Sequence, residues 1–257
     1  MRVAGIAVVT GGASGIGAAC CRYLAKCGAH VAIADRNLAQ AEELAHELSA
    51  HAYAIDISVE DSVRGCAERI ERDFGPVHTL VNCAGLIQGP TRPFELTMQR
   101  WDEITDVDQR GTYLSCVAFG QAMVQRRQGS IVNIASVVGM RSMPLHAYAP
   151  AKAAVISMTA CLAAEWGPAG IRVNCVSPGF TRTSALQKAI DLKGFNTDPM
   201  TSSAALGRLV ETSEIAEVVA FLASDHASAI TGINVPVDCG WLAASTWPAY
   251  GGLRNPR

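Results

Sequence analysis

The chain has 257 residues and a mass of 27.0 kDa, enough for one large domain or two small ones. Hydrophobic residues make up 49% of it and charged residues 17%, which excludes a disordered or highly charged protein. The net charge of −2 provides no basic footprint for nucleic acid and no polybasic patch for a membrane surface. We therefore expect a globular protein whose partner is a small molecule.

The first charge-free segment, residues 3–21, superficially resembles a signal peptide or a membrane span. It contains five glycines, at positions 5, 11, 12, 15 and 17. Glycines at this density favour a tight turn over a lipid-facing helix. We therefore expect this segment to be part of the fold, in a cytoplasmic protein without membrane association.

Short runs rich in β-branched residues alternate with helix-length amphipathic segments. The predicted strands are 3–9, 30–34, 52–55, 78–81, 130–135, 171–176 and 233–237, and the predicted helices are 15–27, 38–49, 59–73, 98–127, 147–166 and 212–223. This alternation indicates a parallel sheet covered on both faces. No linker or composition shift divides the chain. We expect one doubly wound α/β Rossmann domain over residues 1–257, with a mostly parallel seven-stranded sheet and helices on both faces.

Two segments break the alternation of strand and helix. Residues 183–209 are long for a plain connection, and loops of that length are usually functional or disordered, so we interpret them as a substrate lid. Residues 241–257 follow the last predicted strand and contain Trp241, Trp247 and Tyr250. These aromatics favour an extension that docks on the protein over a free tail.

The cysteines and histidines form no disulfide or metal-binding pattern. The nine cysteines are an odd number without a C-x-x-C pair, typical of small buried side chains in a reducing compartment. The six histidines contain no H-x-x-x-H pair. The sequence therefore predicts no metal site.

A glycine-rich turn, T-G-G-A-S-G-I-G at 10–17, lies between the first predicted strand and the first predicted helix. Such glycines let the backbone approach a pyrophosphate, whose negative charge is favoured at a helix start. Asp35 ends the second predicted strand, 18 residues beyond Gly17. A carboxylate there accepts the ribose hydroxyls of NAD and repels the 2′-phosphate of NADP. NAD is therefore favoured, although the adjacent Arg36 offers a partner for a phosphate.

Tyr148 and Lys152 are four residues apart, and hence on one face of a predicted helix. Pro150 is tolerated if that helix begins close to Tyr148. A nearby lysine favours the phenolate, so we expect a lowered Tyr148 pKa and a general acid–base role.

Together these motifs resemble the classical type of the short-chain dehydrogenase/reductase family, over roughly residues 3–240. The resemblance rests on the glycine-rich turn, N-C-A-G at 82–85, Ser136 placed 12 residues before Tyr148, the Tyr148-x-x-x-Lys152 pair, Asn174 before Pro178-Gly179, and Asp238-Cys-Gly. Each motif alone is modest, but the ordered set is specific.

The resemblance implies reversible hydride transfer between NAD and a secondary alcohol or ketone. It implies that Tyr148 exchanges a proton with the substrate oxygen, that Ser136 hydrogen-bonds this oxygen, and that Lys152 holds the nicotinamide ribose. It further implies a cofactor groove formed by Gly11, Ser14, Gly15, Ile16, Gly17, Asp35, Asp56 and Ile57 beside the adenine, Asn82, Ala84 and Gly85, and, at the nicotinamide, Pro178, Gly179, Thr181 and Thr183.

The chain departs from the family at Asp108, in V-D-Q-R-G at 107–111, where the family usually has asparagine. The family uses the carbonyl of this residue to hold a water against the lysine, and Asp108 retains a carbonyl. Its carboxylate, if buried near Lys152, raises the lysine pKa and reshapes the proton relay, so we include Asp108 among the catalytic residues.

Two further departures exchange small residues: N-C-A-G for N-N-A-G and D-C-G for D-G-G. We expect Cys83 and Cys239 to change packing only, with a reactive Cys83 as the alternative.

Residues 153–164 contain no charge around three helical turns, whereas a surface helix normally carries a polar stripe. We expect a second subunit to cover this helix, because similar family members are often tetramers built through the equivalent helices. A homo-oligomer, dimer or tetramer, follows. In the alternative, the small residues lie flush against the chain's own sheet and loops.

The leading hypothesis is an NAD-dependent alcohol, polyol or sugar dehydrogenase. An NADPH-dependent ketone or 3-oxoacyl reductase is the runner-up, which Asp35 and the uncharged Ser14 disfavour. A non-catalytic nucleotide sensor is the alternative from another class, and the complete set of Ser136, Tyr148 and Lys152 argues against it. Residues 140–146, between Ser136 and Tyr148, are candidates for substrate contact.

Overall fold

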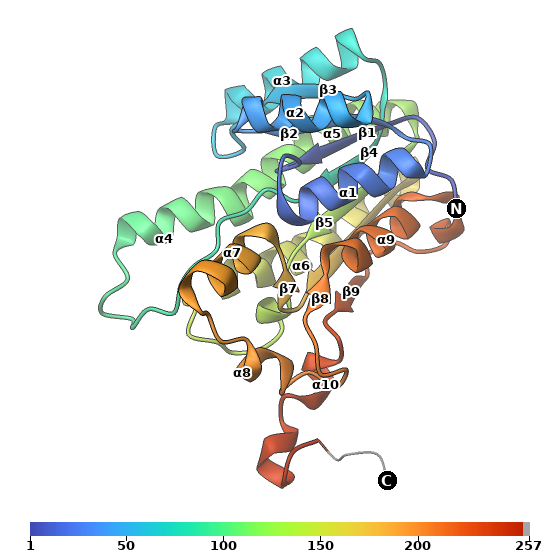
Figure 1. The fold of residues 1–257 in the computed structure, drawn as a ribbon. Coiled ribbons are helices and arrows are strands. Elements are labelled where there is room, and N and C mark those ends of the chain that lie inside the picture. The colour runs from blue at the N-terminus through green and yellow to red at the C-terminus, as the bar shows by residue number, and fades with distance from the viewer. Residues whose placement is uncertain (254–257) are drawn as a thin grey trace.

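The computed structural model describes residues 1–253 and contains a seven-stranded sheet in the order β3-β2-β1-β4-β5-β6-β9 (Figure 1). Every neighbouring pair of strands is parallel. The strands are β1 (Ile6–Thr10), β2 (His30–Asp35), β3 (His51–Ala54), β4 (Val77–Asn82), β5 (Gly129–Ile134), β6 (Ile171–Pro178) and β9 (Asn234–Val237). The strand β1 is buried throughout and β6 at all but one position, because both faces of a parallel sheet are covered. The predicted doubly wound α/β fold is confirmed.

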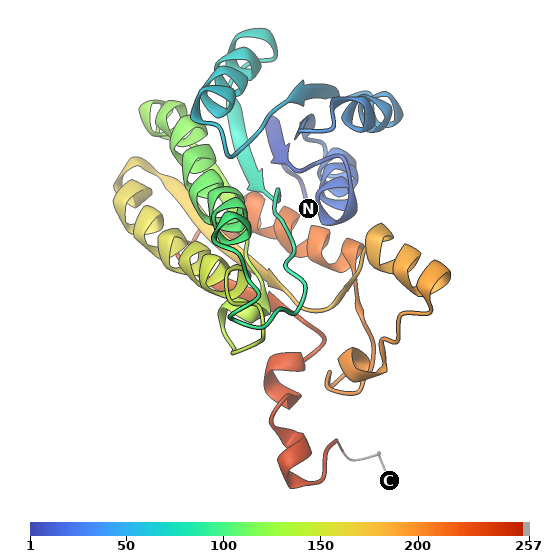
Figure 2. The same ribbon diagram turned by 90° about the vertical axis from the view of Figure 1, so that its left-hand side faces the viewer.

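Helices cover both faces of the sheet (Figure 2). The helices α1 (Gly15–Lys26), α2 (Leu38–Leu48) and α9 (Thr212–Ala223) pack on one face, and α3 (Glu60–Asp73), α5 (Thr112–Arg126) and α6 (Tyr148–Trp166) on the other. Leu24, Leu44 and Ile215 belong to the core on the first side, and Ile70 and Phe119 to the core on the second. Among the described residues, none of the helices has the length and apolarity needed to cross a bilayer.

The predicted helix over 98–127 is wrong as a single element, because a π-helix interrupts it. The segment consists of α4 (Met98–Thr105), the π-helix η1 (Asp106–Gly111) and α5. A π-helical insertion inside an α-helix often marks a functional site. Asp108 lies in this insertion, and its side chain is completely buried.

The segment 183–209 contains two helices, α7 (Ser184–Lys193) and α8 (Asp198–Thr201). Two short strands, β7 (Thr181–Arg182) and β8 (Val210–Glu211), pair in parallel and bring its two ends together. No residue of either helix is buried, so α7 and α8 lie over the surface, whereas Ala204 and Leu209 near the end of the segment are buried.

The C-terminal segment docks through Trp241 alone among its three aromatics. Trp241 begins α10 (Trp241–Ala244), packs edge-on against Phe180 at 5.8 Å between ring centroids, and donates from Nε1 to Ser203 Oγ at 3.0 Å. The following 3-10 helix η5 (Trp247–Tyr250) leaves Trp247 47% and Tyr250 89% exposed and extends below the body of the molecule (Figures 1 and 2). The rest of the predicted extension, residues 254–257, lies outside the described part of the chain.

Three short 3-10 helices complete the described elements: η2 (Val137–Gly139), η3 (Gly167–Ala169) and η4 (Asp225–Ala227). The strand order reverses between β1 and β4, and in doubly wound sheets ligands bind beyond the carboxyl ends of the strands at such a switch point. The predicted cofactor and catalytic residues that follow β1, β4, β5 and β6 therefore converge on one edge of the sheet.

Cys239 contradicts the expectation that its replacement of a family glycine affects packing only. Its φ of +52° lies in the left-handed region, which glycine adopts without a steric penalty. A cysteine at this position therefore strains the backbone of the turn that follows β9.

We expect Cys239→Gly to raise the free energy of unfolding by about 1 kcal/mol, since the relief of strain exceeds the entropy that glycine adds to the unfolded chain. Thermal unfolding should show a Tm about 2–4 °C higher. Cys27→Gly is the control, because Cys27 has a φ of −81° and gains nothing from glycine. A Tm of Cys239→Gly at or below that of the wild type would contradict the strain.

Candidate active site

The glycine-rich turn after β1 forms a cradle at the start of α1. Gly11 and Gly15 have φ values of +64° and +53°, and a Cβ added to Gly11 would lie 2.6 Å from the Cα of Ala84. Ser14 is the N-cap of α1 but makes no side-chain capping hydrogen bond, so the first N–H groups of the helix remain open to an anion. Ile16 and Gly17 lie in that first turn. The turn therefore fits the pyrophosphate of a dinucleotide.

Asp35, at the end of β2, is tied to the same turn. Its Oδ2 accepts from the Ala13 N–H at 3.0 Å and its Oδ1 from the Asn37 N–H at 2.8 Å. Each carboxylate oxygen has further lone pairs and can accept a ribose hydroxyl as well. Arg36 beside it is exposed.

Asp56 and Asn82 have side chains that are already engaged. Asp56 Oδ1 accepts from the hydroxyl of Ser58 at 2.6 Å and from its N–H at 3.0 Å, and the hydroxyl contact lowers the pKa of Asp56. Asn82 is buried and donates to Asn133 Oδ1 at 2.9 Å, between β4 and β5. Its side chain therefore holds the sheet together beneath the groove. Ile57 is buried and packs against Gly111 of the π-helix, where a Cβ would meet the Ile57 carbonyl at 2.7 Å.

The residues after β6 lie close to the glycine-rich turn. Gly179, which follows Pro178, packs so tightly that a Cβ would lie 2.7 Å from the Cα of Asp238. The Thr181 hydroxyl donates to the Gly179 carbonyl at 2.9 Å, and the Thr183 hydroxyl caps α7 by accepting from the Leu186 N–H at 3.2 Å. The Thr183 methyl is 3.7 Å from the Cβ position of Gly15.

Tyr148 and Lys152 share one face of α6, which begins at Tyr148 with Pro150 in its first turn, as predicted. Lys152 Nζ lies 5.4 Å from the centroid of the Tyr148 ring. Ser136 follows β5, and its side chain lies close enough to the Tyr148 phenol to favour the phenolate. The structure thus brings Ser136, Tyr148 and Lys152 together.

Asp108 joins this group through a buried ion pair. Its Oδ1 lies 3.1 Å from Lys152 Nζ, and the two side chains are 0% and 5% exposed. Lys152 also donates to the Ile134 carbonyl at 3.2 Å. The Asp108 carbonyl accepts from the Thr112 hydroxyl at 2.9 Å. The carboxylate therefore contacts the lysine directly. This burial beside Lys152 is the condition under which we expect Asp108 to change the proton relay.

The pKa values correct one expectation about Tyr148. Burial raises the pKa of the phenol, Lys152 lowers it, Asp108 raises it again, and the result lies above the ordinary value. The expectation of a lowered Tyr148 pKa included the effect of the lysine, but it included neither the loss of solvation nor the charge of Asp108. For Lys152, burial favours the neutral amine, but Asp108 and Tyr148 outweigh burial and hold the pKa above its usual value. Lys152 therefore stays cationic.

The Cys83 thiol is held in its protonated form. Burial raises its pKa to about 12, and the nearby Lys152 opposes this only in part. Because the thiolate is the reactive form, the thiol remains inert near neutral pH.

Residues 140–146, between Ser136 and Tyr148 in the sequence, border a hollow beside the start of α6. Met140, Arg141, Met143, Leu145 and His146 line a hollow of about 360 Å³ together with Ala149 and Ala153 of α6.

Sequence reasoning missed Gln88, which contacts the first turn of α6. Its Oε1 accepts from the N–H groups of Ala147 and Tyr148 at 2.9 and 3.0 Å. The sequence signals this contact only through Ala147, the residue before the helix. Alanine has no side chain that can cap a helix, so the acceptor has to come from another part of the chain.

Comparison with known proteins agrees with this architecture. The family model described as enoyl-(acyl carrier protein) reductase matches residues 11–242. D-Threitol dehydrogenase of Mycolicibacterium smegmatis is 38% identical over 92% of both chains, and galactitol 2-dehydrogenase of Rhizobium johnstonii is 37% identical over 91% of this chain and 94% of its own.

Two solved structures have the same fold. The crystal structure of ribose-5-phosphate isomerase from Brucella melitensis 16M is 52% identical, with a TM-score of 0.95 over 98% of this chain and 97% of that one. The structure of ElxO with NADP bound is 29% identical, with a TM-score of 0.88 over 94% of this chain and all (100%) of that one.

The fold and the family match define an oxidoreductase that acts on CH–OH groups. The chain belongs to the short-chain dehydrogenase/reductase family, of the classical type.

Proposed function

We propose that the protein is an NAD-dependent dehydrogenase that reversibly oxidises a secondary hydroxyl of an alcohol, polyol or sugar. The observation that carries the proposal is the position of Lys152 one helical turn from Tyr148, with its Nζ 5.4 Å from the centroid of the phenol ring and Ser136 beside them. The relatives named for threitol and galactitol favour a polyol within this substrate class.

In this proposal NAD is held along the edge of the sheet by the residues that the sequence singled out. The glycine-rich turn takes the pyrophosphate, Asp35 the adenine ribose, and Asp56 with Ile57 the adenine. Ala84 and Gly85 line the groove, Lys152 takes the nicotinamide ribose, and the segment from Pro178 to Thr183 takes the carboxamide. Bound NAD supplies the hydride acceptor. The NADP in ElxO supports the alternative cofactor, against which we weigh the negative charge of Asp35.

Proton transfer is the task of Tyr148 in this mechanism. During oxidation the phenolate takes the proton of the substrate hydroxyl, while the Ser136 hydroxyl hydrogen-bonds the same oxygen and orients it. The Lys152 cation stabilises the phenolate, and Asp108 holds Lys152 in place. During reduction the phenol returns the proton to the carbonyl oxygen. The helices α7 and α8 serve as the substrate lid.

A sugar-phosphate isomerase is the second candidate, because the Brucella melitensis isomerase is 52% identical. An aldose–ketose isomerisation moves hydrogen within one substrate and needs no dinucleotide as a net reactant. The pyrophosphate cradle before α1 therefore favours the dehydrogenase. Ribose 5-phosphate incubated without NAD should remain unchanged, and its conversion would support the isomerase.

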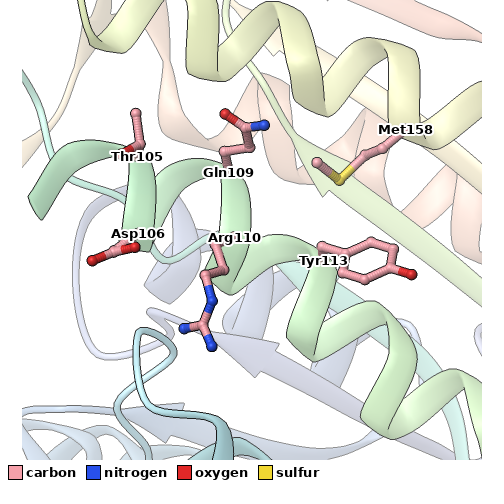
Figure 3. A pocket seen from close by; sticks show the side chains of 6 residues that line it. All are labelled: Thr105, Asp106, Gln109, Arg110, Tyr113 and Met158. Atoms are coloured by element: carbon pink, nitrogen blue, oxygen red, sulfur yellow. The ribbon is translucent and has the colours of Figure 1, made fainter. Parts of the chain in front are cut away.

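The outer face of α6 supports a homo-oligomer. Ser157, Ala160, Cys161 and Ala164 are exposed and uncharged, so the chain's own sheet and loops do not cover them. Beside this face, Met158 of α6 and Gln109, Arg110 and Tyr113 of η1 and α5 line a hollow of about 450 Å³ (Figure 3). We propose that a second copy of the chain covers this face of α6.

We further propose a cytoplasmic location, which the nine free cysteines support.

Sedimentation at micromolar concentration should show a dimer or tetramer. Ala160→Glu places a charge on the exposed face of α6 and should shift the protein toward the monomer. Lys188→Glu, on α7, is a control that should leave the assembly intact. A wild-type protein that sediments as a monomer would contradict the proposed assembly.

NAD should be preferred over NADP by at least about tenfold in kcat/KM, because Asp35 repels the 2′-phosphate. The measurement is NADH or NADPH absorbance with a panel of secondary alcohols, polyols, sugars and hydroxy acids.

Tyr148→Phe should lower kcat by about 10²–10⁴-fold, the usual contribution of a general acid–base, whereas the control Tyr250→Phe should not. An active Tyr148→Phe enzyme, or a preference for NADP, would contradict the corresponding assignment.

Asp108→Asn should keep or increase turnover at neutral pH. The Asp108 charge raises the Tyr148 pKa, so its removal lowers that pKa. Oxidation requires the phenolate, and its rate rises as the pH passes through this pKa. The rising limb of the kcat profile should therefore move to lower pH. Asp102→Asn, at an exposed position of α4, should leave the profile unchanged. A collapse of kcat in Asp108→Asn would show that the carboxylate itself is required.

A further inference from the structure

The helix that carries Tyr148 and Lys152 does not cap its own N-terminus. Its N-cap residue is Ala147, which offers no side-chain acceptor, and the helix has no side-chain capping hydrogen bond of its own. The Ala149 N–H is taken by the Leu145 carbonyl at 2.9 Å, and Pro150 has no N–H. The N–H groups of Ala147 and Tyr148 therefore need an acceptor from elsewhere in the chain.

Gln88 supplies that acceptor from the segment that follows β4. Its side chain reaches the helix start across 59 and 60 residues of sequence, and the residue is only 4% exposed. Both partners are N–H donors, so the atom facing them has to be the amide oxygen. The orientation of the amide group is thereby fixed. Its Nε2 is left buried without a hydrogen-bond partner among the described residues.

An unpartnered buried donor costs stability, so Gln88 is not explained as a residue that only stabilises the fold. Ser136, Tyr148, Lys152 and Asp108 form the proton-transfer group, and the same segment contacts this group at Asp108. The Leu86 N–H donates to Asp108 Oδ1 at 3.1 Å, and the Ile87 carbonyl accepts from Arg100 at 3.2 Å. Gly85 before it leaves no room for a Cβ, which would lie 2.5 Å from Asp108 Oδ1.

We propose that residues 85–88 form a brace between the two ends of the proton-transfer group, with Gln88 as the positioning residue for Tyr148. One end of the brace holds the Asp108 carboxylate that contacts Lys152. The other end holds the backbone of Tyr148 and so fixes the phenol relative to Ser136 and the substrate oxygen. The expected effect of the brace on the reaction rate rests on the proposed dehydrogenase function. Its effect on the start of α6 does not.

Two substitutions separate the roles of the two amide atoms. Gln88→Met keeps the length of the side chain and removes the carbonyl acceptor. Gln88→Glu keeps an acceptor for both N–H groups and removes the Nε2 donor, and a carboxylate is favourable at a helix N-terminus. Gln128→Met, at an exposed position before β5, is the matched control.

In Gln88→Met we expect kcat on the pH-independent plateau to fall about 10- to 100-fold, the cost of a misplacement near 1 Å, with an unchanged KM for NAD. The primary deuterium isotope effect on kcat should grow, because the chemical step becomes slower. Gln88→Glu should restore most of kcat, and Gln128→Met should behave as the wild type. Wild-type kcat in Gln88→Met, or a Gln88→Glu enzyme as slow as Gln88→Met, would overturn the proposal.

Amide hydrogen exchange tests the brace without any enzymatic activity. The N–H groups of Ala147 and Tyr148 should exchange faster in Gln88→Met and at the wild-type rate in Gln88→Glu. Unchanged protection in Gln88→Met would overturn the brace. A wild-type protein inactive on the whole substrate panel would instead contradict the proposed function, while the exchange measurement still decides on the brace.

Discussion

The buried contact between Lys152 and Asp108 is the constraint that shapes the elements around the site. The two charges lie 3.1 Å apart, almost without exposure to solvent. Removing two charges from water costs several kcal/mol for each ion, and mutual attraction offsets that cost only when other hydrogen bonds satisfy the remaining atoms. The Ile134 carbonyl serves Lys152 in this way, and the Leu86 N–H serves Asp108. The pair is therefore a costly arrangement that only its surroundings make tolerable.

The requirements of this pair extend to several elements of the fold. A straight α-helix over 98–127 would not contain the π-helical insertion that carries Asp108. A side chain at Gly85 would occupy the space of the carboxylate. Because the segment after β4, the strand β5 and the helix α6 each contribute a neighbour or a partner, the pair forms only after these non-adjacent segments have assembled. The site therefore depends on the tertiary fold, and no single segment of the chain can form it alone.

The fold could be predicted from the sequence because its signals are local. Buried strands appear as short apolar runs, and the glycine-rich turn, Asp35 and the Tyr148–Lys152 pair each lie within a few residues of the element that positions them. The remaining features depend on contacts distant in sequence. Gln88 is 60 residues from Tyr148, the φ of Cys239 is a backbone property without a signature in composition, and the π-helix contains no proline that would separate it from the helices on either side. The Tyr148 pKa was predicted in the wrong direction because burial and the distance to Asp108 are known only from the structure.

Burial is the main cause of the raised Tyr148 pKa, and the Asp108 carboxylate, placed where a neutral amide would be enough to orient the lysine, raises it further. The negative charge of Asp108 offsets part of the positive charge that Lys152 presents to the phenol, so the phenol keeps its proton more firmly. A phenol of this kind is better prepared to donate a proton to a carbonyl oxygen than to withdraw one from a hydroxyl. In the proposed mechanism, Asp108 therefore slows the withdrawal of a proton near neutral pH and makes oxidation more dependent on alkaline conditions.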